Sequence, residues 1–266
     1  MKKIIIYMTV VFTIIVVIYI AYNYGKPKKN DAESTDFIMG TVVSQVIYGR
    51  DALSCIGENV ECIEFLEDNR ISWRKRTSEL FYINKFARKK KEYPISDELY
   101  GYLQQTRQLA EDSGGALDPT IRPLVKLWGI ERENPVKPEQ EDIDKRLTYV
   151  DYHNFELMNS SYVKMVKGTK LDLGAVGKGI ACDEVYNILR NRQVDGAVIS
   201  VGGSILTYGC KPDGEDWIVA IRDPLGDEDS TLGTLNLIGT NFISTSGSYE
   251  KYFIEDGITY HHILDP

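Results

Sequence analysis

The fold is decided by the stretch Lys170-Leu171-Asp172-Leu173-Gly174-Ala175-Val176-Gly177-Lys178-Gly179-Ile180-Ala181-Cys182-Asp183. Leu171 and Leu173 alternate with Asp172, as the residues of a short half-buried strand do. Three glycines then fall within six residues, from Gly174 to Gly179. Glycines allow sharp turns and let a ligand approach the backbone closely. The stretch therefore predicts a strand at 170–173 that ends in a glycine turn.

A helix is expected behind this turn. Its apolar positions recur at helical spacing and are Ile180, Ala181, Val185, Ile188 and Leu189. Asp183 and Glu184 are expected in the first turn, where the helix dipole favours acidic side chains. The free N–H groups at a helix start suit an anion, and Lys178 adds a positive charge that suits phosphate.

This stretch matches neither of two common nucleotide-binding patterns. A P-loop would have Gly in place of Asp172 and Ser or Thr in place of Gly179. The dinucleotide pattern G-x-G-x-x-G is also absent. Judged alone, the stretch is equally compatible with an ordinary strand-to-helix turn and with an anion site.

The overall composition is that of a folded, acidic protein. The chain has 266 residues, of which 43% are hydrophobic, so it can form one large domain or two small ones. Its formal net charge of −8 argues against general binding to nucleic acid. A single nucleotide in a locally basic pocket is still compatible with this charge.

Residues 4–22 are almost wholly apolar and follow Lys2 and Lys3. A run of about nineteen such residues can cross a bilayer. A cleaved secretory signal would end in a small-x-small site, which Ala21-Tyr22-Asn23-Tyr24 does not supply. We therefore expect an uncleaved anchor at 1–22, a linker at 23–35 and one body at 36–266.

The anchor is expected to be a single-pass transmembrane helix of the cell membrane with an extracytoplasmic body. Lys26, Lys28 and Lys29 follow the span, and they keep a cytoplasmic body open as the alternative.

Hydrophobic periodicity predicts a mixed α+β body. Helices are expected at 55–69, 96–113, 137–147 and after the glycine turn. The helix at 96–113 has Ser96 as its N-cap and ends at Gly114-Gly115. Strands are expected at 37–48, 155–158, 162–166, 197–204, 217–222, 232–238 and 241–245.

The cysteines and histidines offer few chemical alternatives. None of the four cysteines forms a C-x-x-C pair, and no histidine lies at zinc-finger spacing. Cys55 and Cys62 could form a disulfide or stay free thiols, and Cys182 is expected to be a small buried hydrophobe. His261 and His262 are adjacent, and either proton transfer or an ordinary place on an edge strand would explain them.

Six motifs occur in a fixed order along the chain. They are Leu117-Asp118-Pro119-Thr120 with Pro123-Leu124 and Leu127-Trp128-Gly129; Asp172-Leu173-Gly174 with Lys178-Gly179 and Asp183; Gly202-Gly203; Ile221-Arg222-Asp223-Pro224; Thr245-Ser246-Gly247 with Tyr249; and His262-Ile263-Leu264-Asp265-Pro266. Together with Met39-Gly40-Thr41, they resemble the ApbE-type flavin transferases, which are FAD:protein FMN transferases. The resemblance runs from Met39 to the last residue.

The resemblance implies an α+β fold related to the T-fold, with mixed sheets and packed helices around an FAD cleft. It also implies Mg²⁺-dependent transfer of FMN from FAD to a Thr hydroxyl of a partner flavoprotein, with AMP as the leaving group. A subunit of a membrane redox complex or an exported flavoprotein is the implied partner class. Two alternatives stay open: an FAD pyrophosphatase that yields FMN and AMP, and a membrane-anchored FAD-binding protein without catalysis.

The resemblance also assigns roles to particular residues. The FAD site would include Met39, Ala116, Leu117, Asp118, Asp172, Lys178, Ile263 and Leu264. Ala175 would offer its backbone carbonyl to Mg²⁺, and His262 would be the catalytic base. Family members have either Lys or Glu at the place of Lys178. The loop at Trp73-Arg74 also aligns with a family contact, although its register is not fixed by the sequence.

One departure from the family pattern concerns the end of the chain. Family members continue past the Asp-Pro with Thr-Gly and later supply an Asp and a Thr that complete the metal site. The printed sequence stops at Pro266. We therefore expect a C-terminally truncated chain that binds Mg²⁺ weakly and has little activity as it stands.

Overall fold

The computed structural model describes residues 31–86, 92–159, 161–227 and 230–266. The expected anchor at 1–22 and the linker up to residue 30 lie outside these residues. Within the described ranges, no helix is long and apolar enough to span a bilayer. The expected linker is nevertheless too long, because the first strand already begins at Asp31.

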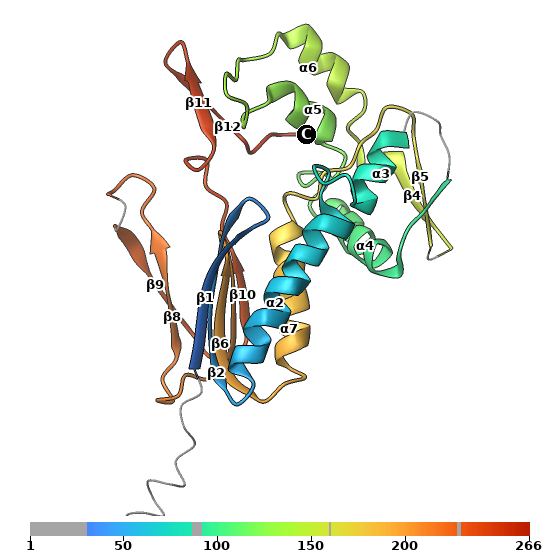
Figure 1. Ribbon diagram of the computed structural model, residues 1–266. Helices are drawn as coiled ribbons and strands as arrows, with labels where there is room; N and C mark the ends of the chain where they lie inside the picture. Colours follow the sequence, from blue (N-terminus) through green and yellow to red (C-terminus); the bar gives the residue numbers. More distant parts are fainter. Residues whose placement is uncertain (1–30, 87–91, 160, 228–229) are drawn as a thin grey trace, which may run out of the picture.

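The described residues form a mixed α+β structure, as the sequence predicts (Figure 1). The strands are β1 (Asp31–Ile38), β2 (Thr41–Gly49), β3 (Glu92–Pro94), β4 (Phe155–Met158), β5 (Tyr162–Met165), β6 (Val194–Val201), β7 (Ser204–Gly209), β8 (Trp217–Arg222), β9 (Thr231–Leu237), β10 (Asn241–Ser244), β11 (Tyr252–Glu255) and β12 (Ile258–His261). The helices are α2 (Ala52–Leu66), the π-helical η1 (Glu67–Ile71), α3 (Glu79–Phe86), α4 (Asp97–Asp112), α5 (Arg122–Trp128), α6 (Gln140–Leu147), the 3-10 turn η3 (Tyr152–Asn154) and α7 (Gly177–Leu189).

The largest sheet has the strand order β1-β2-β6-β7-β10, and every neighbouring pair in it is antiparallel. Helices α2 and α7 pack side by side against this sheet (Figure 1). Alternate residues of β2 and β6, such as Val43 and Ile199, are fully buried beneath the helices. This alternation explains why period-2 patterning identified the strands.

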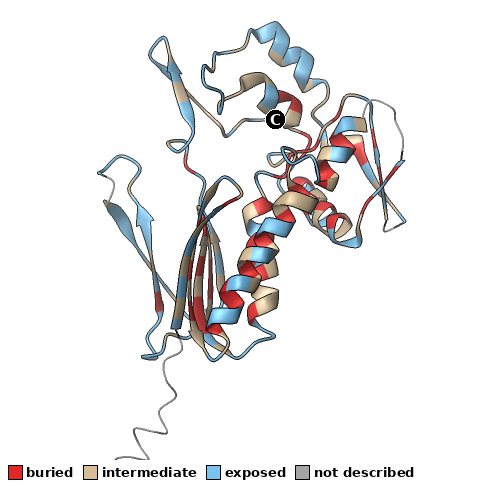
Figure 2. Ribbon diagram, viewed as in Figure 1, coloured by how far each residue is buried: buried red, intermediate tan, exposed pale blue. Residues whose placement is uncertain are grey.

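A second group of elements lies at the upper end of α2. Strands β3, β5 and β4 form a small antiparallel sheet next to α3 and α4 (Figure 1). Buried residues run without a break from the large sheet through α2 and α7 into this group, so the two parts share one core (Figure 2). Two hairpins, β8–β9 and β11–β12, form separate two-stranded sheets.

Several predicted elements are confirmed with small shifts in their boundaries. Ser96 caps α4, and its hydroxyl accepts a hydrogen bond from the Leu99 N–H at 3.2 Å. The hairpin of β4 and β5 occurs as predicted, and β8 spans the predicted residues 217–222. Helix α6 has no buried residue and is a surface helix. The helix predicted at 55–69 is longer, because α2 begins at Ala52 and continues into η1.

The single strand predicted at 37–48 is wrong. The chain instead makes a hairpin of β1 and β2 with Met39 and Gly40 as its two-residue turn. Both turn residues have positive φ, 56° for Met39 and 69° for Gly40. Tight hairpins favour this conformation, and Asn-Gly is their usual signal. Met39 stands where Asn would be expected, so the sequence carries no turn signal.

The strand predicted at 170–173 is reduced to one bridge between Lys170 and Ile121. Leu171 does not pair with another strand, because the side chain of Asn84 makes hydrogen bonds with both its N–H and its carbonyl. Asn84 Nδ2 donates to the Leu171 carbonyl, and the Leu171 N–H donates to Asn84 Oδ1, both at 2.7 Å. A buried amide therefore replaces a neighbouring strand and holds the segment before the glycine turn.

Helix α7 begins earlier than expected. Its first residue is Gly177, so Asp183 and Glu184 lie beyond the first turn, which contains no acidic residue. The glycines of the turn are thus partly the first residues of the helix. Cys182 is buried as predicted, and burial raises the pKa of its thiol to about 12.

Cys55 and Cys62 are free thiols. Both lie on α2, seven residues apart, which places them about 10 Å apart along the helix axis. A disulfide needs Cα atoms within roughly 7 Å of each other. The free-thiol alternative is therefore the one that the structure supports.

We predict that Asn84→Ala lowers the free energy of unfolding by about 2–4 kcal/mol, because it leaves the buried N–H and C=O of Leu171 without partners. Urea unfolding followed by circular dichroism measures this loss. Asn191→Ala is the control, since in the part of the chain that the structure describes the Asn191 side chain makes one solvent-exposed hydrogen bond, to the Asn187 carbonyl. Equal losses in the two variants would contradict the role given to Asn84.

Candidate functional site

A cleft of about 760 Å³ lies where the β1–β2 turn, α5, the glycine turn and the C-terminal segment meet. Its volume is in the range of pockets that hold cofactors. Every residue to which the sequence assigned a role lines this cleft: Met39, Ala116, Leu117, Asp118, Asp172, Ala175, Lys178, His262, Ile263 and Leu264. Segments that are far apart in the sequence are thus brought to one place.

Met39 enters the cleft in a strained conformation. Its φ of 56° is uncommon for a residue with a long side chain. The Met39 N–H donates to Glu67 Oε2 at 3.0 Å, and Glu67 begins the π-helical end of α2. On its other side, Met39 Cε lies so close to Gly177 that a Cβ there would be only 3.3 Å away. Local strain of this kind is typical of functional sites.

Asp118 is oriented by Thr120. Its Oδ1 accepts hydrogen bonds from the Thr120 N–H at 2.7 Å and from the Thr120 hydroxyl at 2.6 Å. Thr120 is fully buried, and its hydroxyl also accepts a bond from the Asp151 N–H at 2.8 Å. The second carboxylate oxygen of Asp118 makes no hydrogen bond to the part of the chain that the structure describes, so it is available to a ligand.

Asp172 lies at the floor of the cleft with only 8% of its surface exposed. Its N–H donates to the Pro119 carbonyl at 2.7 Å, and its Oδ1 accepts from the Gly174 N–H at 2.9 Å. Burial raises the pKa of Asp172, and the Gly174 N–H and the charge of Arg122 only partly oppose this rise. The structure therefore holds a carboxyl group where ionisation is costly.

The first turn of α7 offers donors to an anion. Gly177 N–H bonds the Leu173 carbonyl, but the N–H groups of Lys178 and Gly179 have no acceptor among the described residues. The Lys178 side chain also lines the cleft. Free N–H groups, the positive end of the helix dipole and a lysine together suit a phosphate group. The anion-site interpretation of the glycine turn thus gains a geometric basis.

Two guanidinium groups lie against the indole ring of Trp73 in the lining of the cleft. Arg122 Cζ lies 3.4 Å from the centre of the indole ring, and Arg74 Cζ lies 3.9 Å from it. Burial lowers the pKa of Arg122, although this group keeps its charge at any physiological pH. The loop at Trp73-Arg74, whose register the sequence left open, therefore contributes both residues to the site.

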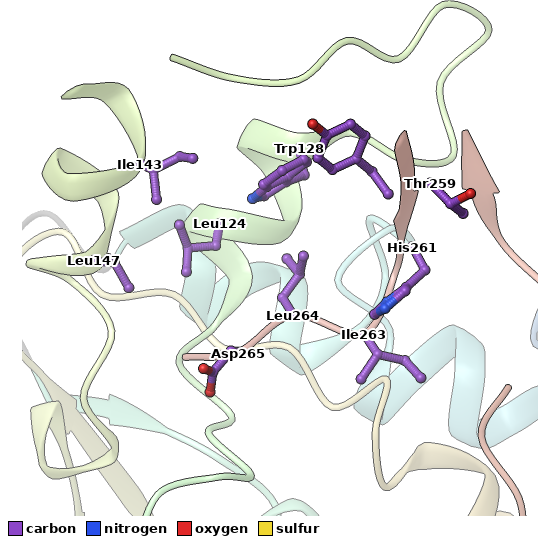
Figure 3. A pocket seen from close by; sticks show the side chains of 10 residues that line it. Leu124, Trp128, Ile143, Leu147, Thr259, His261, Ile263, Leu264 and Asp265 are labelled. Atoms are coloured by element: carbon purple, nitrogen blue, oxygen red, sulfur yellow. The ribbon is translucent and has the colours of Figure 1, made fainter. Parts of the chain in front are cut away.

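His262 and His261 face different cavities. His262 lines the cleft, while His261 lines a smaller pocket of about 290 Å³ between α5, α6 and the C-terminal segment (Figure 3). In that pocket Leu264 points toward Leu124 and Trp128 (Figure 3). Ile263 and Leu264 line both cavities. Only one histidine of the adjacent pair is thus placed to act in the cleft.

The backbone of Lys251 fixes the orientation of His262. The His262 N–H donates to the Lys251 carbonyl at 3.0 Å, and His262 Nδ1 lies 3.3 Å from the same oxygen. A carbonyl only accepts hydrogen bonds, so Nδ1 carries the proton when the ring is neutral. The lone pair is then on Nε2, which makes this nitrogen available as a base.

The cleft is lined by charged side chains of both signs, and several of them were not marked in the sequence analysis. The cationic side chains that line it are Arg74, Arg122, Lys126, Arg132, Lys178 and Lys251, and the carboxylates are Glu67, Asp118, Glu131, Asp172 and Glu250. The cleft is therefore locally balanced in an otherwise acidic chain. Arg122 lies between the two parts of the motif that contains Thr120 and Pro123, but its charge alone did not mark it. Glu131 and Lys251 come together only through the fold, so no local pattern could identify them.

Within residues 31–86, 92–159, 161–227 and 230–266, no group of three or more His, Cys, Asp or Glu side chains could hold a metal ion. The Ala175 carbonyl lies in the glycine turn and accepts no backbone hydrogen bond in these ranges. Mg²⁺ commonly takes one or two protein oxygens and completes its shell with water and substrate phosphates. The donors present fit a magnesium ion of that kind.

We predict that Asp172→Asn raises the free energy of unfolding at pH 7. The raised pKa of Asp172 means that the folded state binds this proton more tightly than the unfolded state, so wild-type stability falls as pH rises through this range. The gain should shrink as pH is lowered and wild-type Asp172 becomes protonated. Urea unfolding from pH 4 to 8 measures this gain, and Asp112→Asn, at an exposed position at the end of α4, is the control. A gain that does not depend on pH would contradict this explanation.

Comparison with known proteins shows to which family the chain belongs. A model of the ApbE family matches residues 39–266. The "FAD:protein FMN transferase" of Escherichia coli K12 is 29% identical over 236 residues, which cover 86% of this chain and 67% of that protein. The protein of the same name from Treponema pallidum is 32% identical over 187 residues, covering 65% of this chain and 51% of that protein. The chain thus spans about half the length of some curated relatives.

Solved structures agree with the sequence match. The ApbE protein of Thermotoga maritima superimposes with a TM-score of 0.81 at 29% identity, covering 89% of this chain and 76% of that one. The apo flavinyl transferase ApbE of Pseudomonas stutzeri gives a TM-score of 0.78 at 25% identity, covering 90% of this chain and 75% of that one. The match extends from the strained turn at Met39 to Pro266, and the chain belongs to the ApbE family.

Proposed function

We propose that this protein is a Mg²⁺-dependent FAD:protein FMN transferase that moves FMN from FAD to a Thr hydroxyl of a partner flavoprotein and releases AMP. The observation that carries the proposal is the convergence of all ten assigned residues on one cleft. The names of the relatives, FAD:protein FMN transferase, support it. FAD is the substrate in this proposal, and the acceptor is a second protein.

The cleft supplies the two things that phosphoryl transfer requires of a protein, which are positioning and charge neutralisation. The free N–H groups at the start of α7, together with Lys178 and Arg122, are the donors for the pyrophosphate. Asp118 and Asp172 stand on the floor, each held by backbone hydrogen bonds. The strained Met39 turn and the segment Ile263-Leu264 provide apolar surface for the ring systems of FAD.

His262 is the proposed general base. With Nδ1 turned to the Lys251 carbonyl, Nε2 takes the proton from the acceptor hydroxyl. The hydroxyl oxygen then forms a bond to the phosphorus of the FMN half. The bond between this phosphorus and the bridging oxygen breaks, and AMP leaves with that oxygen and its electron pair. The products are an FMN phosphoester on the acceptor and AMP.

A magnesium ion would be held in part by the Ala175 carbonyl and by the phosphates of FAD. When bound, it neutralises charge that develops on the pyrophosphate oxygens.

We also propose that residues 1–22 anchor the protein in the cell membrane with its body outside the cytoplasm. The apolar run at 4–22 supports an anchor. Extraction of membranes at alkaline pH tests it, because an integral anchor stays with the membrane. An exported flavoprotein or a subunit of a membrane redox complex would then be within reach as the acceptor.

The assay for this function mixes the protein, both as the printed chain and in a form extended past Pro266, with FAD, Mg²⁺ and a co-expressed acceptor flavoprotein, and follows both AMP and protein-bound flavin. Equal amounts of AMP and of flavin on an acceptor Thr are the expected result. Release of FMN and AMP without labelled protein would replace the proposal with an FAD pyrophosphatase. FAD binding without AMP at any Mg²⁺ concentration would leave a flavin-binding protein.

We predict that His262→Ala lowers the rate of FMN transfer by about 10²–10⁴-fold, the usual contribution of a general base. The affinity for FAD, measured by flavin fluorescence, should stay within about twofold of wild type. His261→Ala is the matched control, because His261 faces the other pocket. Transfer at the wild-type rate in His262→Ala would remove the role proposed for this residue.

A further inference from the structure

The hairpin that carries His262 has few contacts of its own. Among the described residues, strands β11 and β12 pair only with each other, from Tyr252↔His261 to Glu255↔Ile258. The bond from the His262 N–H to the Lys251 carbonyl extends this ladder by one step at its base. An isolated two-stranded hairpin is marginally stable in water. Figure 1 shows it as an arm beside α5 and α6, away from the large sheet. The position of His262 therefore depends on what ties the arm down.

Three contacts join this hairpin to the last residue of α5 and to the segment that follows it, up to residue 137. At the base, Glu131 Oε1 accepts a hydrogen bond from Lys251 Nζ. In the middle, the rings of Trp128 and Tyr260 lie with their centres 5.4 Å apart. Near the tip, Glu255 Oε2 accepts from the Lys137 N–H at 2.8 Å. Of these contacts, only the one at the base reaches a residue that bonds His262.

We propose that Glu131 is a positioning residue for His262 and acts through Lys251. Lys251 uses its side chain to bind Glu131 and its carbonyl to hold both the N–H and Nδ1 of His262. Fixing this one residue thus fixes both the place of the imidazole and the tautomer that leaves Nε2 free. The inference rests on the role that the proposed function gives to His262.

Glu131 is itself held from two sides. Its Oε2 accepts from Arg74 Nη2, and Arg74 stacks on Trp73 across the entrance of the cleft. Burial acts to raise the pKa of Glu131, but the Lys251 hydrogen bond and the Arg74 charge outweigh it and lower the pKa. The carboxylate is therefore ionised at neutral pH and links one wall of the cleft to the base of the hairpin.

This link is suited to positioning rather than to stability. Glu131 and Lys251 are each nearly half exposed, and exposed ion pairs add little to the stability of a fold. In contrast, a misplacement of about 1 Å in a catalytic group can slow a reaction about 100-fold. A structural role and a positioning role therefore predict different results.

The experiment compares Glu131→Ala, Lys251→Met and the double variant in the transfer assay. We expect each single variant to lower kcat about tenfold or more, with the KM for FAD within about twofold and the midpoint of urea unfolding unchanged. The double variant should be no slower than the slower single variant, because both remove the same link. Lys251→Arg should restore most of the rate.

Glu255→Ala is the matched control, because it removes a hydrogen bond of similar exposure from the tip of the same hairpin. Its kcat should stay within about twofold of wild type. A comparable loss in Glu255→Ala, additive losses in the double variant, or a rise in KM without a fall in kcat would each overturn the proposal.

A second readout does not depend on activity. The chain has three histidines, so the NMR signals of the labelled rings can be assigned by His153→Ala, His261→Ala and His262→Ala. Lys251→Met and Glu131→Ala should shift the His262 signals and abolish its preference for a proton on Nδ1, whereas Glu255→Ala should not. Unchanged His262 signals would overturn the proposal. If neither the printed chain nor a form extended past Pro266 transfers FMN, the proposed function fails, and the NMR result alone decides whether Glu131 positions His262.

Discussion

The buried clamp between Asn84 and the backbone of Leu171 is the contact on which the cleft depends. Both polar groups of the Asn84 side chain are used on one peptide segment, at 2.7 Å each. The segment leads directly into Asp172 and the start of α7, and the Asp172 N–H in turn bonds the Pro119 carbonyl beside Asp118. The amide of Asn84 thus fixes the positions of two loops of the cleft. Because α7 follows one of these loops directly, the N–H donors at its start are positioned by the same contact.

Much of this architecture could be predicted from the sequence because it follows from periodicity and capping. The cap at Ser96, the pairing of β4 with β5 and the buried Cys182 all express rules that act over a few residues. The turn at Met39 could not be predicted, because a long side chain there opposes the local preference and only the surrounding contacts enforce it. The strand expected at 170–173 failed for a related reason, since a side chain 87 residues away took the place of a neighbouring strand.

In the site, too, some residues could be predicted from local sequence patterns and others could not. The ten residues to which the resemblance gave a role in the site all line one cleft. Arg122, Glu131 and Lys251 also carry charge in the cleft. Glu131 and Lys251 lie outside the quoted motifs, and Arg122 lies between two parts of one. Their role depends on neighbours that lie far away in the sequence: Glu131 and Lys251, for example, are 120 positions apart. Distances of this kind are fixed by the fold and leave no trace in local spacing.

The alternation of His261 and His262 makes the C-terminal segment sensitive to length. Successive residues of a strand point to opposite sides, and a shift by one residue exchanges the two faces. An insertion or deletion of a single residue in β12 would therefore turn His261 toward the cleft and His262 toward the apolar pocket, without changing any residue type. Within β12, side chains can change without moving either histidine, but the addition or removal of a single residue exchanges the sides to which the two histidines point.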